Sequence, residues 1–173
     1  MIHLFPHNTL FLSLFAWCQP PLRIDDPVRA VLQARAFAAG SPHDCLGARR
    51  FAIHHEARAG TAHSVRAAFE AALESDACRG SAELWIRYLR FCCSSGRGGG
   101  AKELRGRARE VFYRAIGACP GAKEIYMEAF GPRMRGLLSR SELRAVVETM
   151  VEKGLRVHVD LGEFLERWKG EER

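Results

Sequence analysis

Three adjacent residues, His54, His55 and Glu56, have the side chains most suited to a metal or acid–base site. A helical zinc-protease motif needs its two histidines four residues apart, so that both lie on one helix face. Adjacent histidines point in different directions, which favours a structural or surface role. Asp25 and Asp26 could form a metal-binding pair, but the proline that follows them predicts the start of a helix instead.

The glycine-rich segment 94–100 (SSGRGGG) is the next candidate, as a phosphate-binding loop. No Lys-Ser or Lys-Thr pair follows it and no strand pattern precedes it, so we interpret it as a flexible connection. No spacing indicates a Ser/His/Asp or Cys/His nucleophile set, and no Cys/His cluster has zinc-ligand spacing. The sequence therefore predicts no catalytic residue, no metal and no cofactor.

The six cysteines form no CxxC motif. Cys92 and Cys93 are neighbours on a predicted helix and so point apart. Cys92 and Cys119 fall on apolar helical positions, where a free thiol acts as a small hydrophobe. We interpret all six as reduced, which is typical of an intracellular protein.

A basic segment carries the net charge of the chain. Residues 87–114 hold eight Lys or Arg against two acids, which equals the whole formal charge of +6. Such a segment could contact RNA or an acidic protein, and the side chains expected to do so are Arg97, Lys102, Arg105 and Arg109. The alternative is a solvated helix face with Glu–Arg pairs four residues apart.

The apolar segment 10–18 (LFLSLFAWC) is too short to span a bilayer. No Lys or Arg precedes it, so we expect a core helix over 9–17 rather than a secretory signal, which is the alternative. We expect no membrane association. If the chain is a fragment, this helix exposes an apolar face through Leu10, Phe11, Leu14 and Phe15, which favours self-association.

One helical stripe occurs twice, 43 residues apart. Its members share the i, i+3, i+4, i+7, i+8 spacing of one helix face: Val65, Ala68, Phe69, Ala72 and Leu73, then Ala108, Val111, Phe112, Ala115 and Ile116. The same stripe occurs a third time at Leu143, Val146, Val147, Met150 and Val151. Helices of this kind bury their stripes by stacking copies. The eight side chains expected to form the repeat core are Val65, Phe69, Ala72, Trp85, Tyr88, Ala108, Phe112 and Ala115. Trp85 and Tyr88 could instead stack on an RNA base, although their spacing favours packing.

Turn and capping residues predict where each helix begins and ends. We expect helices over about 9–17, 27–39, 44–59, 61–75, 81–92, 102–117, 122–130, 139–153 and 160–168, with 155–159 able to be extended. The predicted fold class is all-α, an α-α superhelix of stacked antiparallel helix pairs. The expected organisation is N-terminal helices over 1–43, helical repeats over 44–168 and a frayed tail over 169–173.

The helix pair 84–120 resembles a half-a-tetratricopeptide (HAT) repeat. The matching residues are Trp85, Tyr88 and Phe91, then Ala108, Arg109, Val111, Phe112, Arg114, Ala115 and Ile116, closed by Pro120. Longer stretches over 5–17, 22–31, 63–73, 111–130 and 149–161 together resemble the C-terminal region of the nuclear RNAi defective family of HAT proteins. The resemblance covers nearly the whole chain.

This resemblance implies a HAT/TPR-like fold and a nuclear, non-catalytic scaffold in RNA processing or small-RNA silencing, acting on other proteins of those processes. Direct RNA binding through Arg87–Arg114 is the second hypothesis, and a small hydrolase or transferase, which no motif favours, is the third. Family members are much longer, so we expect a fragment, a truncated copy or a degenerate copy. Partners held elsewhere in the family, such as the nuclear-exosome RNA helicase, cannot be assigned to these residues.

Overall fold

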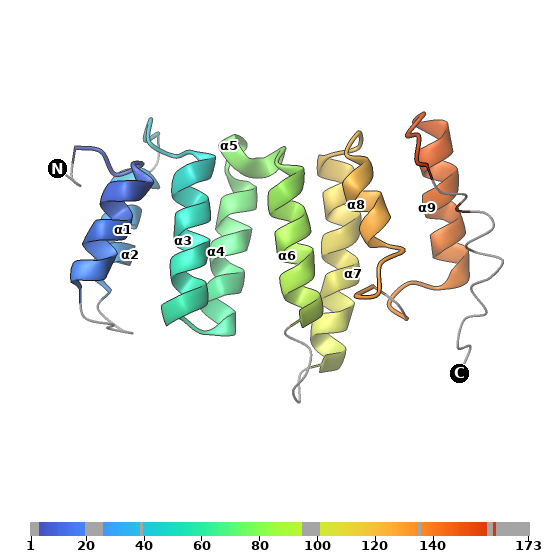
Figure 1. Cartoon of the computed structure of the whole chain (residues 1–173), viewed down its shortest axis with the longest axis horizontal. Helices are drawn as coiled ribbons and strands as arrows, with labels where there is room; N and C mark the ends of the chain where they lie inside the picture. Colours follow the sequence, from blue (N-terminus) through green and yellow to red (C-terminus); the bar gives the residue numbers. More distant parts are fainter. Residues whose placement is uncertain are drawn as a thin grey trace. The chain divides into compact units, whose positions relative to one another are not determined.

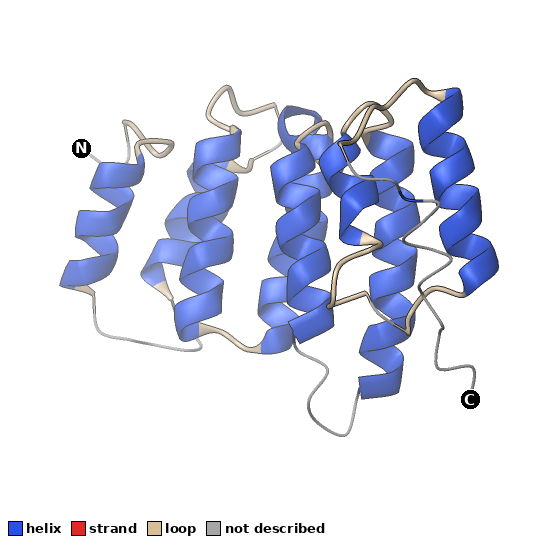
Figure 2. Cartoon of the chain, turned by 45° about the vertical axis from the view of Figure 1, so that its right-hand side comes forward, coloured by secondary structure: helices blue, strands red, loops and turns tan. Residues whose placement is uncertain are grey.

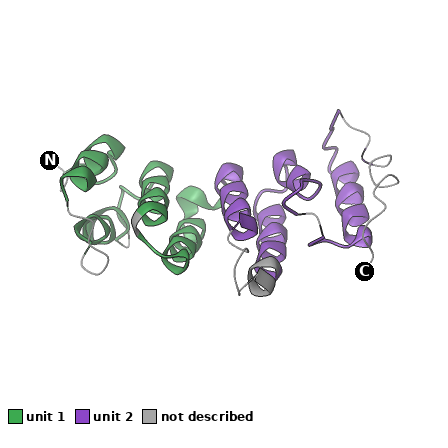
Figure 3. Ribbon diagram, turned by 60° about the horizontal axis from the view of Figure 1, so that its bottom comes forward, with its two compact units in different colours: residues 1–80 green, residues 81–173 purple. Residues whose placement is uncertain are grey.

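The computed structural model describes residues 4–19, 26–38, 40–94, 101–134, 136–158 and 161, with the backbone alone for residues 59 and 101–105. Within these ranges every regular element is helical, and loops and turns join the helices (Figure 2). The chain forms two compact units, residues 1–80 and 81–173 (Figure 3). The predicted all-α class with packed, HAT/TPR-like helix pairs is confirmed for this part of the chain.

The first unit consists of short helices (Figure 1), and side chains cap the starts of α1, α2 and α4. They are α1 (Thr9–Cys18), α2 (Pro27–Val31), η1 (Leu32–Ala36), α3 (Leu46–Ala59), α4 (Ala62–Glu74) and α5 (Asp76–Arg79). The Asn8 side chain accepts hydrogen bonds from the first turn of α1, and Thr61 with Ser64 forms a capping box at α4. Two residues separate α3 from α4, so these helices pack antiparallel, side by side in Figure 1.

The core of this unit joins the N-terminal helices to α3. Leu12 of α1 is fully buried with Val28, Leu32 and Ala36 of α2 and η1 and with Ala48 of α3. Helices from both sides of the expected boundary at residue 43 therefore share one core, and the observed division between compact units follows Gly80. The assignment of 44–168 to repeats stays a prediction, and the tail 169–173 lies outside the described residues.

The expected helix over 27–39 is divided. After α2 the chain widens into the π-helical turn η1, where the Phe37 amide donates to the Leu32 carbonyl at 2.9 Å. The wider turn keeps both Leu32 and Ala36 in the core, and the Phe37 ring faces the Arg49 guanidinium. π-helical turns occur preferentially at functional sites.

The second unit is centred on a helix pair. It contains α6 (Ala82–Ser94), α7 (Ala101–Ala118), α8 (Lys123–Glu128) and α9 (Arg140–Glu152), with α6 and α7 side by side in Figure 1. Facing apolar stripes of α6 and α7 are buried, and α8 adds Ile125 and Tyr126 to the interior. The expected capping box of Ser139 and Glu142 begins α9, and Gly154 ends it with a left-handed φ of 65°.

Three local expectations differ from the structure. The four-residue helix α5 was not predicted, because so short a segment has no periodicity to read. Val151 belongs to the predicted stripe of α9, but it is 73% exposed in the last turn of that helix. Residues 155–158 form no strand. The helix expected over 160–168 lies outside the described residues except for Leu161.

Candidate functional site

The eight residues expected in the repeat core are all buried. Val65, Phe69 and Ala72 lie on the inner face of α4 in the first unit. Trp85 and Tyr88 of α6 and Ala108, Phe112 and Ala115 of α7 lie in the interior of the second. Their role in the fold follows from this burial, because a side chain inside a helix pair presents no face on which a base can stack.

The basic segment is partly neutralised by acids from outside it. Arg109 Nε donates to Glu142 Oε1 at 2.8 Å, and the Tyr113 hydroxyl donates to the same oxygen at 2.9 Å. Arg90 Nε donates to Glu128 Oε1 at 3.0 Å. Both acids lie far along the chain, on α8 and α9, so these side chains meet only in the folded unit.

Two further members of the segment contact residues that precede it, and the side chains of three others are not described. Arg87 Nε donates to Glu83 one turn earlier at 3.0 Å, and the Arg114 guanidinium lies 5.4 Å from the centre of the Trp85 ring. Arg97 lies outside the described residues. Lys102 and Arg105 lie on α7, where the structure describes the backbone alone. Of the four expected RNA contacts, the structure thus describes the side chain of Arg109, which is in an ion pair.

A groove of about 280 Å³ lies within the first unit, between α2–η1, α3 and α4. One wall is made of alanines, Ala67, Ala68 and Ala71, on the outer side of α4. Leu32 and Phe37 form the opposite side. Because alanine leaves the α4 wall without long side chains, a hollow remains that an apolar side chain of another molecule can fill.

One end of the groove is fixed by an ion pair between α2 and α3. Arg29 Nε and Nη2 donate to the two carboxylate oxygens of Glu56 at 2.8 and 2.9 Å. Burial raises the pKa of Glu56, but the hydrogen bonds from Arg29 and Ser64 outweigh burial and hold the pKa below its usual value. A bidentate pair of this kind fixes the guanidinium plane as well as its position.

Asp26 continues this network at the start of α2. Its carboxylate accepts the Val28 amide at 2.9 Å as the helix cap, as the sequence predicts, and it lies 2.5 Å from His55 Nε2. Burial raises the pKa of Asp26, and the hydrogen bonds of His55 and the backbone amides more than offset it, so the net pKa is lowered. His55 and Glu56 thus hold two helices together, whereas His54 is exposed to solvent.

The other end of the groove contains a second bidentate pair. Arg49 Nε and Nη2 donate to Asp44 at 2.7 Å each, and the Ser75 hydroxyl donates to the same carboxylate at 3.0 Å. The hydrogen bonds from Arg49 lower the pKa of Asp44. The Arg49 guanidinium also lies 3.9 Å from the centre of the Phe37 ring. Both ends of the groove are therefore fixed by ion pairs within the chain.

Within the ranges that the structure describes, no three His, Cys, Asp or Glu side chains are grouped to hold a metal ion. The six cysteines are free, and burial raises the pKa of Cys78, Cys93 and Cys119, which disfavours the reactive thiolate. No described helix is long and apolar enough to cross a membrane.

No local sequence pattern predicts the groove, because its polar members are far apart in the chain. Arg29 and Glu56 are 27 residues apart, and Asp26 and His55 are 29 apart. One signal was available: Ala67 and Ala71 lie beside the predicted stripe of α4, and Ala68, a member of that stripe, is half-buried in the groove wall, so this helix face has no long side chains.

Comparison with known proteins finds similarity in sequence. The chain is similar to a nuclear exosome regulator. It is 38% identical over 105 residues to the nuclear exosome regulator NRDE2 of Mus musculus and 36% identical over 107 residues to that of Homo sapiens. Each match covers 61% of this chain and 8% of the relative, so the chain corresponds to a small part of the length of these proteins. No family model and no solved structure matches. Both relatives are named as nuclear exosome regulators, and the HAT type of the repeats stays a prediction.

Proposed function

We propose that this chain is a non-catalytic helical-repeat scaffold of the HAT type that acts in nuclear RNA processing by binding other proteins. The observation that carries the proposal is the similarity to two nuclear exosome regulators over 61% of the chain. A nuclear location and partners among RNA-processing proteins follow from the same similarity. The family resemblance suggests a more specific process, small-RNA-mediated silencing with heterochromatin formation, as part of this proposal.

The groove of the first unit supports binding as the mode of action. Its two ends are fixed by bidentate pairs before any partner arrives, so little conformational freedom is lost at the rims on binding. The middle of the groove is apolar. The groove as a whole has a volume of about 280 Å³, enough for one or two large apolar side chains of a partner. Such anchors supply most of the binding energy of protein interfaces.

The test depletes the protein from cells that express it and measures nuclear transcripts normally removed by the exosome. We expect those transcripts to accumulate and the unsubstituted chain to restore them. Ala71→Trp fills the groove from the α4 wall, whereas Ala57→Trp places the same ring on an exposed position of α3 outside the groove. Both positions are exposed helical alanines, so both variants should fold.

We expect rescue by Ala57→Trp and failure of rescue by Ala71→Trp, with loss of co-purified RNA-processing proteins in the second variant alone. Equal rescue by both variants would show that the groove is not the binding surface. A protein found only outside the nucleus, with transcripts unchanged on depletion, would refute the proposed process itself.

Direct RNA binding through Arg87–Arg114 is the second candidate function, and the high charge of that segment favours it. The carboxylates facing Arg90 and Arg109 weaken it, because a paired guanidinium offers less charge to phosphate. Fluorescence anisotropy with single-stranded RNA at two salt concentrations separates the two functions. Phosphate contacts predict affinity that falls steeply with salt, and an absence of salt-sensitive binding would exclude this candidate.

A further inference from the structure

The outer face of α1 is apolar and uncovered in the first unit. Leu12 on the inner side is fully buried, while Leu10, Leu14 and Trp17 on the outer side are 63%, 48% and 85% exposed. These three residues follow the spacing of one helix face. Leu4 and Phe5, which precede the helix, are 68% and 45% exposed. We call these five residues the α1 face.

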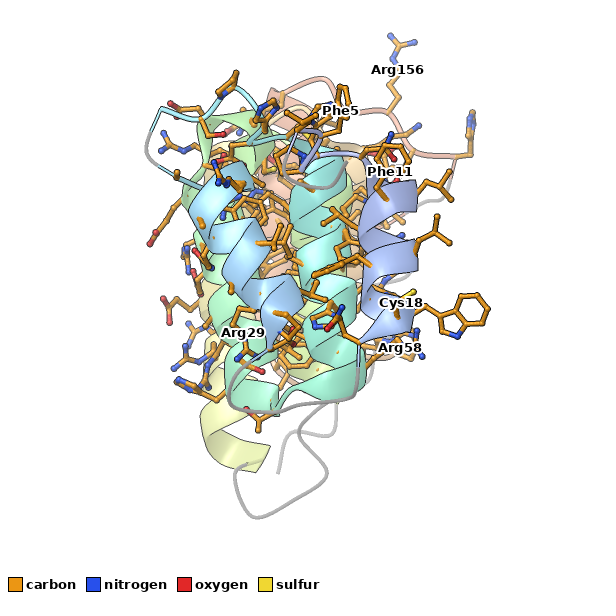
Figure 4. The ribbon with its side chains drawn as sticks, turned by 90° about the vertical axis from the view of Figure 1, so that its left-hand side faces the viewer. Phe5, Phe11, Cys18, Arg29, Arg58 and Arg156 are labelled. Atoms are coloured by element: carbon orange, nitrogen blue, oxygen red, sulfur yellow. The ribbon has the colours of Figure 1, made fainter. Side chains whose placement is uncertain are left out.

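A helix at the surface of a protein normally has a polar outer side, because a large exposed apolar patch favours association. The α1 face does not. In Figure 4, Phe11 and Cys18 lie at opposite ends of α1, and side chains of this helix project both toward the other helices and away from them. The helix therefore resembles one that packs on both sides.

We propose that two copies of this chain associate through their α1 faces, with the two α1 helices antiparallel across a two-fold axis near Leu14. A two-fold contact joins the same patch on both subunits, so the patch must be complementary to itself in shape and charge. No Asp, Glu, Lys or Arg occurs between Leu4 and Cys18, so α1 itself brings no charged side chain to the contact. The antiparallel arrangement also places the positive end of each helix dipole beside the negative end of the other.

The size of the face is sufficient for a weak dimer. Its five side chains expose roughly 400 Å² of apolar surface per copy, from their exposed fractions and typical side-chain areas. A standard interface buries about 800 Å² per partner, a little over half of it apolar. The α1 face therefore supplies most of the apolar area of such an interface, and we expect a dissociation constant in the micromolar range.

The antiparallel register makes a specific geometric prediction. If Leu14 lies on the axis, position 10 of one copy faces position 18 of the other. Cys18 is exposed and occupies that second position. Leu10→Cys should then form two symmetric disulfides between copies under a mild oxidant, and the unsubstituted chain should form none, because its own Cys18 residues lie at opposite ends of the contact.

The experiment is sedimentation velocity on the full chain between about 1 and about 200 μM, with oxidative cross-linking. We expect a monomer at low and a dimer at high concentration. Leu14→Glu places two carboxylates at the axis and should raise the dissociation constant at least tenfold, whereas Val151→Glu, at an apolar residue 73% exposed on α9, should not change it. Leu10→Glu provides a second face variant if Leu14→Glu fails to fold by circular dichroism.

A monomer throughout the concentration range overturns the proposal, as does a dimer that is equally stable in both face variants. Ready cross-linking through Cys18 in the unsubstituted chain overturns the antiparallel register. The Cys18→Ser variant of Leu10→Cys should lose the cross-link, and retention of the cross-link would mean that another thiol is involved. These outcomes do not depend on the proposed function. The proposed function is tested separately, by transcript levels and by the proteins that co-purify.

Discussion

Phe112→Ala tests the central packing of the second unit. Phe112 is fully buried on α7, its ring lies 5.4 Å from the Tyr113 ring in an edge-on arrangement, and its helix neighbours on the buried face are Ala108 and Ala115. Small neighbours cannot move far enough to fill the space left by a phenyl ring. A Phe→Ala change in such a site removes about 3–5 kcal/mol from the free energy of unfolding.

The assay is urea denaturation followed by circular dichroism, with thermal unfolding as a second measure. For a chain of this length, the loss corresponds to a fall in melting temperature of about 6–20 °C. Val151→Ala is the control, because its side chain is exposed and its change should stay within about 0.5 kcal/mol. A loss below about 1 kcal/mol for Phe112→Ala would refute the placement of this ring in a tightly packed interior. Separate transitions for the two compact units would be fitted individually, since a single free energy would then have no meaning.

Three further predictions concern the polar contacts. Glu56→Gln breaks the bidentate pair with Arg29 and should cost about 1.5–3 kcal/mol in urea denaturation, against a change within about 0.5 for the exposed Glu74→Gln. The pKa values of Asp44 and Glu56 are lowered in the fold, so their stabilisation is complete only above the pKa values of the unfolded chain, at about pH 5 and higher, and is lost as the pH falls through the folded values. Denaturation midpoints should therefore fall with acidification below that pH, and Glu56→Gln should show a shallower fall; an unchanged slope would contradict this. Ser139→Ala removes the cap of α9 and should cost about 1 kcal/mol, and no measurable loss would mean that the cap contributes nothing.

Much of the fold could be predicted from the sequence, because helices have local signals: apolar residues at helical spacing and capping residues at their ends. The stripe of Val65, Phe69 and Ala72 has the period of one helix face, and that face is the buried one. The cap at Ser139 and the left-handed Gly154 fixed both ends of α9 in advance. The π-helical turn and α5 escaped prediction, since a single turn is too short for a period and depends on what packs against it.

The sequence by itself determined the helices, their buried stripes and the charge of the basic segment, because each of these depends on residues within a few turns. Only the tertiary structure decided which charges face one another. Arg109 meets an acid 33 residues away and Arg29 an acid 27 residues away, and no periodic pattern links such positions. The groove has the same origin: the alanines of α4 form a wall only because α2, η1 and α3 close the other sides. Periodicity specifies which face of a helix is buried, whereas the partner of that face is fixed by packing in three dimensions.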